Sequence, residues 1–390
     1  MAEKLLVVDD EPDLEIVVTQ RFRKAIRAKQ YLFFFAHNGL EALEIISEQP
    51  DISVVITDIN MPEMTGLELL QKIKELNNPK LKVIIVSAYG DMPNIRFAMN
   101  NGSFDFLTKP IDMNDLEKTI EKTIELVKVI RDGIESHERL IDYERELDAA
   151  RQIQQAILPK EFPPFSNPNL FDIYGRMKAA KMVGGDLFDF FAIDDENLGF
   201  VIGDVSGKGI PSSIFMAVAR TLIHSYGQTG VSTAECLRLT NGILCIESVD
   251  SMFVTVFYGI LKVNTGEVRF TNAGHNYPYL LENNGGIRQL DNESNIILGV
   301  FDEAQYTEHS FFLKPNESIV LYTDGVNEAM DTHHNQLGYD TFQKHLATMP
   351  DRQSPKSITD SIFDLVKAHE ADTEQSDDIT VLTITYFGNK

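Results

Sequence analysis

The chain has 390 residues, more than one ordinary hydrophobic core accommodates, so we expect two or three domains. Its 43% hydrophobic and 24% charged residues are typical of a globular protein, and its net charge of −24 argues against nucleic acid, whose phosphates it would repel. Two cysteines form no disulfide framework and no apolar run approaches membrane-spanning length, so we expect a reduced, cytoplasmic protein without a membrane partner.

Short apolar, strand-forming runs alternate with amphipathic stretches over about the first 112 residues. Five β/α repeats of this kind predict an α/β domain of flavodoxin-like type, with a doubly wound parallel sheet whose site lies at the carboxyl ends of the strands. The expected strands are residues 5–8, 31–36, 52–57, 81–87 and 104–107, and the helical stretches include 14–28, 39–47 and 67–76.

Polar side chains follow these expected strands at their carboxyl ends. They are Asp9, Asp10, Asp58, Ser87 and Lys109. The acids would hold a divalent cation beside a nucleophilic carboxylate, and the lysine and hydroxyl would bind phosphoryl oxygens.

The segments VVDDEP, TDINMPEMTGLELL, SAYG and FLTKP closely resemble the receiver domain of two-component response regulators, over residues 1–120. The resemblance implies aspartyl phosphorylation by a cognate histidine kinase or another phosphodonor, with Mg²⁺ as cofactor. It further implies that Asp58 accepts the phosphoryl group, that Asp9 and Asp10 hold Mg²⁺ together with Asp58, that Ser87 and Lys109 are the hydroxyl and lysine of the pocket, and that Phe106 is the aromatic switch.

Residues 113–158 are rich in Glu, Lys, Ile and Leu and contain no proline. Apolar residues recur there at heptad-like spacing, which predicts a helical linker about 70 Å long at about 1.5 Å per residue. Such a helix is too one-sided to stand alone, so we expect a dimerising coiled coil and a homodimer. The alternative is two shorter helices that break near Gly133 and pack on their own domains. The prolines that end the helix are Pro159, Pro163, Pro164 and Pro168.

The heptad pattern of this linker changes register along its length. The stripe through Val127 and Ile134 is displaced by one residue from the stripe through Leu140 and Leu147, which is about 100° of helix rotation. We hypothesise that receiver phosphorylation selects one register and moves residues 149–158 against the strands that follow; a simple hinge near Gly133 is the alternative.

Beyond residue 159, long strands dominate and helices occur in clustered pairs, which predicts an α+β domain over 159–390: an antiparallel β-sandwich flanked by helices. The expected helices are residues 212–226, 233–248, 339–349 and 356–369. The expected strands are residues 187–192, 198–202, 252–263, 267–272, 277–282, 307–313, 318–323 and 379–387.

Four acidic loops abut these strands, at Asp186, Asp204, Asp324 and the pair Asp377 and Asp378. Crowded carboxylates raise one another's pKa unless a cation lies among them, and oxygen ligands without His or Cys suit Mg²⁺ or Mn²⁺. A solvated turn explains any one of these acids but poorly explains all four.

The segments AARQIQQAILP, MVGGDLFDF, GDVSGKG, MFVTVFYGIL, NAGHNYP, LYTDGVNEA and SDDITVL resemble the SpoIIE-like branch of the metal-dependent, type 2C (PPM family) serine/threonine protein phosphatases, over residues 145–388. The resemblance implies two Mn²⁺ or Mg²⁺ ions that activate water for in-line attack on a phosphate. It implies that Asp204 bridges the two ions, that the Val205 carbonyl is a further ligand, that Asp324 and Asp377 complete the shell of the second ion, and that Asp186 holds water. Asp378 and His275 are weaker candidates, and we expect His275 to belong to the core or a loop.

The two resemblances together predict a response regulator whose aspartyl phosphorylation controls a phosphoserine/phosphothreonine protein phosphatase. The implied substrate is a phosphorylated protein of the anti-sigma-factor-antagonist type, in a partner-switching pathway. The alternative is a catalytically inactive, phosphatase-like scaffold or adaptor that receiver phosphorylation controls.

Overall fold

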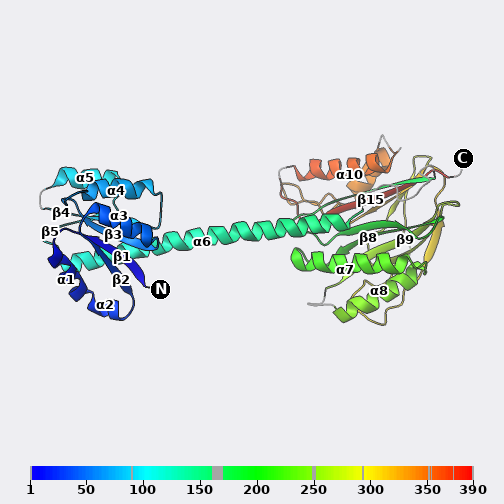
Figure 1. Cartoon of the computed structure of the whole chain (residues 1–390). Coiled ribbons are helices and arrows are strands. Elements are labelled where there is room, and N and C mark those ends of the chain that lie inside the picture. Colours follow the sequence, from blue (N-terminus) through cyan, green and yellow to red (C-terminus); the bar gives the residue numbers. More distant parts are fainter. Residues whose placement is uncertain are drawn as a thin grey trace. The chain divides into compact units, whose positions relative to one another are not determined.

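The computed structural model describes residues 2–88, 91–159, 170–247, 252–291, 294–349, 352, 354–371 and 373–388. The chain forms two compact units, Met1–Tyr143 and Glu144–Lys390. Helix α6 (Met113–Ile157) begins in the first unit and ends in the second (Figure 1). Several residues named above lie outside the described residues: Tyr89 and Gly90 of the SAYG segment, Pro163, Pro164, Pro168 and Ser248.

The first unit contains the predicted parallel sheet, with strand order β2-β1-β3-β4-β5. Helices cover both faces: α1 and the first turns of α6 pack on one, and α3, α4 and α5 on the other (Figure 1). The strands are β1 (Glu3–Val8), β2 (Tyr31–Ala36), β3 (Ile52–Asp58), β4 (Lys82–Ala88) and β5 (Asp105–Lys109). The helices are α1 (Pro12–Arg21), α2 (Arg23–Arg27), α3 (Gly39–Glu48), α4 (Gly66–Glu75) and α5 (Met92–Asn100).

The central strand β3 is buried along its whole length, as expected for a parallel strand covered on both faces. It delivers Asp58 to the carboxyl edge of the sheet. The next helix starts at Thr65, whose side chain forms a capping box with Glu68. Gly66 lies so close to β3 that a Cβ there would lie 1.9 Å from the carbonyl oxygen of Asp58. A residue without a side chain is therefore required beside the strand end.

The second unit is the predicted antiparallel sandwich, built from two five-stranded sheets of orders β13-β10-β9-β8-β7 and β12-β11-β14-β15-β6. The strands are β6 (Phe171–Lys178), β7 (Leu187–Ala192), β8 (Asn197–Val205), β9 (Val254–Lys262), β10 (Glu267–Ala273), β11 (Tyr279–Leu281), β12 (Ile287–Gln289), β13 (His309–Phe312), β14 (Glu317–Tyr322) and β15 (Ile379–Tyr386). The helices are α7 (Ile210–Gly227), α8 (Thr233–Glu247), α9 (Tyr339–Thr348) and α10 (Pro355–Glu370).

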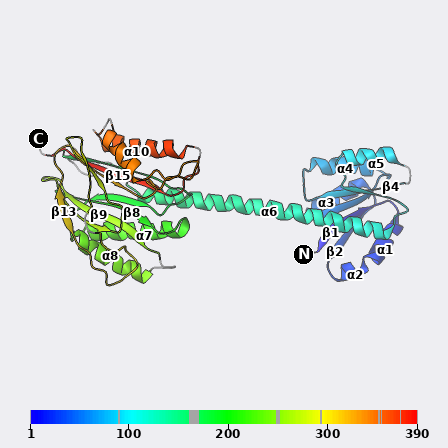
Figure 2. The same ribbon diagram turned by 180° about the vertical axis from the view of Figure 1, so that it is seen from behind.

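Three hydrophobic cores hold this sandwich together. One lies between the sheets and includes Phe200, Phe257 and Leu382. A second lies beneath α7 and α8, and a third beneath α9 and α10, so a helical pair covers each outer face (Figure 2). The antiparallel pairs β7-β8 and β14-β15 belong to different sheets. The loops before β7, after β14 and before β15 meet at one end of the sandwich, where Thr323 bonds to Asp186 and Gly185 to Asp378.

The linker is one continuous helix, and the break near Gly133 considered above does not occur. Its apolar stripe, however, is buried near the start of the helix and exposed further along it. Ile120 and Ile124 are buried in the core of the first unit, so they are unavailable to a second chain. Residues 135–146 are exposed, with Leu140 and Tyr143 at 62% and 58% exposure. Any intermolecular seam is therefore confined to the second half of the helix.

Two further differences separate the predicted elements from the observed ones. The expected helix over 14–28 divides into α1 and α2 around Phe22, whose ring turns into the core. Strands β6 and β12 lie outside the predicted strands; β6 alternates buried with partly exposed residues, and Gly175 interrupts its apolar face. Among the residues that the structure describes, no helix is long and apolar enough to cross a membrane.

Candidate functional site

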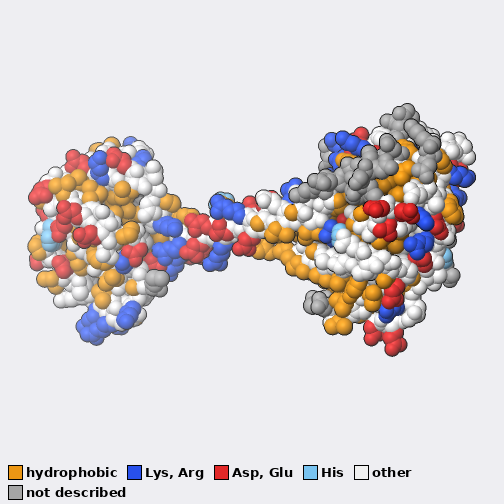
Figure 3. Space-filling model, turned by 45° about the vertical axis from the view of Figure 1, so that its right-hand side comes forward, with side chains coloured by type: hydrophobic (Ala, Val, Ile, Leu, Met, Phe, Trp, Pro, Cys, Tyr) orange, Lys and Arg blue, Asp and Glu red, His pale blue; other side chains and the backbone are white. Residues whose placement is uncertain are grey.

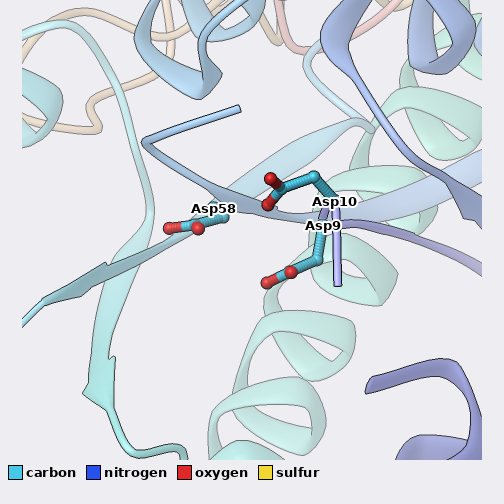
Figure 4. Close-up of side chains that lie close together, drawn as sticks. All are labelled: Asp9, Asp10 and Asp58. Atoms are coloured by element: carbon cyan, nitrogen blue, oxygen red, sulfur yellow. The ribbon is translucent and has the colours of Figure 1, made fainter. Parts of the chain in front are cut away.

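The first unit gathers three acids at the carboxyl edge of its sheet. Asp9 and Asp10 follow β1, and Asp58 ends β3 (Figure 4). One carboxylate oxygen from each lies within 4.8 Å of the others, and no other set of three potential metal ligands in the described chain meets that distance. Asp9 and Asp58 are buried and Asp10 is exposed. The backbone N–H of Ile59 donates to Asp58 Oδ1 at 2.7 Å, which fixes the rotamer of this carboxylate.

Lys109 at the end of β5 neutralises part of this charge. Its Nζ lies 2.8 Å from Asp58 Oδ2 and 3.0 Å from Asp9 Oδ2. Burial by itself would lower the pKa of Lys109, but the bonds to these two carboxylates outweigh it and raise the pKa above its ordinary value. The ammonium is therefore permanently charged and joins the ends of three strands. A cis peptide bond links it to Pro110.

The two remaining predicted residues of this pocket are placed by neighbouring strands. Ser87 near the end of β4 is fully buried, and its hydroxyl lies 3.5 Å from Asp91 Oδ2. Phe106 on β5 is partly exposed. Because β4 lies between β3 and β5, the hydroxyl comes from the strand between those of Asp58 and Lys109.

In the second unit, four loops from both sheets bring the predicted acids to one end of the sandwich. Asp186 precedes β7, Asp204 lies near the end of β8, Asp324 follows β14, and Asp377 precedes β15. A Cβ on Gly325 would lie 1.9 Å from the carbonyl oxygen of Asp378, so glycine is needed for these last two loops to approach. The carboxylates interact electrostatically, although no three of them lie within 4.8 Å of one another.

Burial and mutual repulsion raise the pKa of three of these acids, Asp186, Asp204 and Asp324. Burial, then the charges of Asp324 and Asp377, raise the pKa of Asp204 to about 7. Burial and the charge of Asp377 raise that of Asp324 to about 6. Complete burial, followed by the charge of Asp204, raises the pKa of Asp186 well above its usual range. Asp186, Asp204 and Asp324 are thus harder to ionise without added positive charge.

Neighbouring groups hold these acids in place. The hydroxyl of Thr323 donates to Asp186 Oδ2 at 2.7 Å, and itself accepts from the backbone N–H of Thr380. The carbonyl oxygen of Val205 lies close to the loop before β7: a Cβ added to Gly185 in that loop would be 2.9 Å from this oxygen. Val205 therefore presents a further oxygen beside the residue that precedes Asp186.

Lys208 is a cation of this end of the sandwich that sequence reasoning did not single out. It lies in the loop between β8 and α7, flanked by Gly207 and Gly209, which both have positive φ. Its Nζ lies 2.9 Å from Asp377 Oδ2 and donates to the carbonyl oxygen of Ser376 at 2.6 Å. It therefore balances Asp377, the outermost acid. The deeper pair, Asp186 and Asp204, has no ion pair with a lysine or arginine in the described chain.

Comparison with known proteins places both units. The family model for the response regulator receiver domain matches residues 5–121. Sporulation initiation phosphotransferase F of Bacillus subtilis is 34% identical over 127 residues, which are 32% of this chain and 97% of that protein. The chain is a member of the response regulator family. Its first unit is accordingly a receiver domain.

The second unit carries a SpoIIE-type phosphatase domain, because the family model for stage II sporulation protein E (SpoIIE) matches residues 194–387. Phosphoserine phosphatase RsbU of Bacillus subtilis is 27% identical over 244 residues, 61% of this response regulator and 69% of RsbU. The SiaA-PP2C domain of Pseudomonas aeruginosa shares its fold: the TM-score is 0.55 at 21% identity, over 64% of this chain and 98% of that domain. Asp186 precedes the matched range, so its place rests on geometry.

One further relative is much longer than the region it shares with this response regulator. Protein IcfG of Synechocystis sp. is 28% identical over 270 residues, which are 61% of this chain but 41% of IcfG. The shared region therefore spans less than half of that relative.

The two weaker candidates of the phosphatase domain, Asp378 and His275, are held by hydrogen bonds to neighbouring loops and strands. Asp378 accepts hydrogen bonds from the backbone N–H groups of Ala180 (2.8 Å) and Gly185 (2.6 Å), so both its oxygens are engaged. His275 is buried, its Nδ1 pairs with the Thr255 hydroxyl at 2.9 Å, and burial lowers its pKa to about 4. A neutral, enclosed imidazole is no acid at neutral pH, which agrees with the expected place of His275 in the core.

The donor sets of both domains fit hard divalent cations. All predicted side-chain ligands are carboxylates, the donors that Mg²⁺ and Mn²⁺ take, and no His or Cys of the described chain joins them. In the receiver the three oxygens are close enough for one ion. In the phosphatase domain no three of these acids bring one oxygen each within 4.8 Å of one another, and Mg²⁺ sites commonly complete their shell with water. A bound cation would offset the burial and repulsion that raise the pKa values of Asp204 and Asp324.

Proposed function

We propose that this response regulator hydrolyses phosphoserine or phosphothreonine on a partner protein, and that phosphorylation of Asp58 controls the rate. The observation that carries the proposal is the group of acids at the end of the sandwich. Asp186 and Asp204 are buried together with raised pKa values and without an ion-paired basic side chain in the described chain. Such buried, mutually repelling carboxylates are unfavourable unless bound cations neutralise them, so this arrangement is typical of a functional metal site.

Each residue of the site has a role that its position supports. Asp204 interacts electrostatically with Asp324 and Asp377 and also with the side chain of Asp186, which suits a carboxylate shared by two ions. Two Mn²⁺ or Mg²⁺ ions bound there would activate the attacking water and neutralise the phosphoryl oxygens. The hydroxyl of Thr323 keeps Asp186 oriented, and the Val205 carbonyl adds a neutral oxygen.

The receiver supplies the control. Asp58 is the nucleophile for a phosphodonor, normally a cognate histidine kinase, and Mg²⁺ held by Asp9, Asp10 and Asp58 shields the approach of two anions. Lys109 stays protonated beside Asp58 and can bind a phosphoryl oxygen. The buried hydroxyl of Ser87 and the ring of Phe106 would respond to the modified carboxylate.

The linker supports a homodimer as part of this proposal. Leu140 and Tyr143 are exposed on α6, and the stripe continues toward Ala150 and Ile157. There, α6 and α7 line an apolar groove of about 540 Å³, and hydrophobic side chains gather around it (Figure 3). A second α6 would bury these side chains.

We propose a phosphorylated protein of the anti-sigma-factor-antagonist type as the substrate. Two features support it: the resemblance to the SpoIIE-like branch, and the 27% identity to RsbU, a phosphoserine phosphatase. The net charge of −24 argues against nucleic acid as the substrate, because it would repel the phosphates.

The test is hydrolysis of a phosphoserine protein by the full chain, with Mn²⁺ and with EDTA, before and after treatment with an acyl-phosphate donor. We expect turnover that needs the metal and changes with receiver phosphorylation. A folded chain that binds Mn²⁺ yet releases no phosphate under any of these conditions would instead be a scaffold or adaptor.

A further inference from the structure

The loop that carries Asp186 is attached to the linker helix by one side chain. Gln154, in the last turn of α6, is 7% exposed. Its Nε2 donates to the carbonyl oxygen of Gly184 at 2.7 Å, and its Oε1 accepts from the N–H of the same residue at 3.1 Å. The amide therefore satisfies both polar groups of Gly184, two residues before Asp186.

The rest of this loop has little freedom to move independently. Asp378 holds the backbone N–H groups of Ala180 and Gly185. A side chain at position 184 would collide with the Asp378 carboxylate at 2.4 Å. Each anchor is on a different element, with Asp378 before β15 and Gln154 on α6. A shift of α6 is consequently transmitted to Gly184 and not absorbed by slack in the loop.

We propose that Gln154 is a positioning residue, through which α6 sets the backbone of Gly184 and thereby the metal-binding placement of Asp186. The inference rests on the proposed metal-dependent function and names how that site is regulated. A rotation of α6 by one residue, about 100°, carries Gln154 away from the loop. The buried N–H and C=O of Gly184 then lack partners, so the loop rearranges to recover hydrogen bonds.

The neighbours of Gln154 show why this role belongs to it alone on the helix end. Gln152 is exposed and its amide pairs with Asp148 on the same helix. Gln155 is also exposed. Ile153 cannot donate or accept through its side chain. Gln154 is thus the glutamine of this segment that reaches the metal-bearing loop, and Gln155 provides a matched control of the same residue type.

The first experiment measures Mn²⁺ binding by isothermal titration calorimetry on the full chain. All chains carry Asp9→Asn and Asp10→Asn, which silence the site in the receiver. Gln154→Met keeps the length of the side chain but removes both hydrogen bonds. We expect the dissociation constant of the phosphatase sites to rise about 10- to 100-fold, as for other partners that orient metal ligands. Gln155→Met should leave it at the parental value.

The second experiment uses chains with an intact receiver and follows phosphatase rate against Mn²⁺ concentration. A positioning role predicts that Gln154→Met needs more Mn²⁺ but recovers most of the parental kcat at saturation. It also predicts that the ratio of rates with and without receiver phosphorylation falls toward one. Circular dichroism confirms folding, and Gln154→Ala serves where Gln154→Met folds poorly.

The outcomes separate this inference from the function on which it rests. If folded Gln154→Met and Gln154→Ala bind Mn²⁺ with parental affinity, the positioning role is wrong even when the parent is an active phosphatase. If the parent binds Mn²⁺ but hydrolyses no phosphoprotein, the proposed function fails, while the calorimetry still decides whether Gln154 controls metal binding.

Discussion

The receiver and the phosphatase domain both collect acids at strand ends, but they balance the charge differently. In the receiver, Lys109 lies 2.8 Å from Asp58 and 3.0 Å from Asp9 and holds them in ion pairs. In the phosphatase domain, Lys208 reaches Asp377 alone, and within the described residues Asp186, Asp204 and Asp324 form no ion pair with lysine or arginine. The charge in the deeper part of this second site has no counterion from the chain itself.

From this difference we infer that the phosphatase site depends more strongly on a bound cation than the receiver site does. In the receiver, Asp58 is paired with the ammonium of Lys109, so the charge of this carboxylate is balanced without a cation. In the phosphatase domain, burial and then the repulsion of neighbouring acids raise the pKa of Asp204 to about 7 and that of Asp324 to about 6. We therefore expect metal removal to affect the stability of the phosphatase domain more than that of the receiver.

The largest expected effect is at the receiver acceptor. Asp58→Ala removes the carboxylate that attacks the phosphodonor, so acid-labile phosphorylation by an acyl-phosphate donor should fall to background. Basal phosphatase turnover should remain, because the acids of the other domain are untouched. Phosphate-affinity gel electrophoresis measures the first and phosphate release the second. Asp13→Asn, an exposed acid of α1, should be labelled like the parent; labelling that persists in Asp58→Ala would assign the acceptor elsewhere.

Next in size is the shared acid of the phosphatase domain. Asp204→Asn keeps the shape of the side chain but removes the charge that we place between two cations, so phosphatase turnover should fall by several orders of magnitude. Receiver phosphorylation should be unchanged. The control is Asp195→Asn, an exposed acid in the turn between β7 and β8. Near-parental turnover in Asp204→Asn would eliminate the two-ion assignment.

A smaller effect is expected when an acid loses only its orienting partner. Thr323→Val keeps the volume of the side chain but removes the 2.7 Å hydrogen bond to Asp186. The Mn²⁺ concentration for half-maximal activity should rise by about 10- to 100-fold. Thr385→Val is a matched control, because Thr385 also loses a buried hydroxyl contact, to Ser318, at the other end of β15. Equal metal requirements in the two variants would show that Thr323 does not orient Asp186.

The smallest effect is on stability, and its sign follows from the raised pKa values. Between pH 3.8, the ordinary pKa of an aspartate, and about 7, folded Asp204 binds more protons than the unfolded chain. In EDTA the phosphatase domain should therefore lose about 2–4 kcal/mol of unfolding free energy as pH rises through this window. Mn²⁺ should suppress the loss by neutralising the ionised carboxylates.

Differential scanning calorimetry between pH 5 and pH 8 measures this dependence. The transition of the phosphatase domain is the one that Asp204→Asn shifts. That variant should be less sensitive to pH in EDTA and more stable than the parent at pH 8, although it is inactive. A parent whose transition temperature in EDTA rises with pH over this range would contradict the charge repulsion described here.

The sequence by itself determined the fold class of both domains, but it left open whether the linker is one helix or two; the structure shows one helix. Alternating β/α repeats can form few arrangements other than a doubly wound sheet, and acids at strand ends must meet at its edge. The short motifs around Asp58 and Asp204 likewise act locally, so their positions follow from strand and turn signals. Strand β6 was missed although Phe171, Ile173 and Met177 alternate with more polar residues, because it follows a proline-rich stretch and Gly175 interrupts the apolar face.

Only the tertiary structure decided what each acid contacts. Asp377 and Asp378 are adjacent in sequence, yet the first pairs with Lys208 while the second holds the backbone of Ala180 and Gly185. The tertiary structure likewise buried Ile120 and Ile124 within the receiver and turned Gln154 onto Gly184. These contacts join residues far apart in the chain, and no periodicity encodes them. They arise because packing brings separate loops together, where each buried polar group must find a partner.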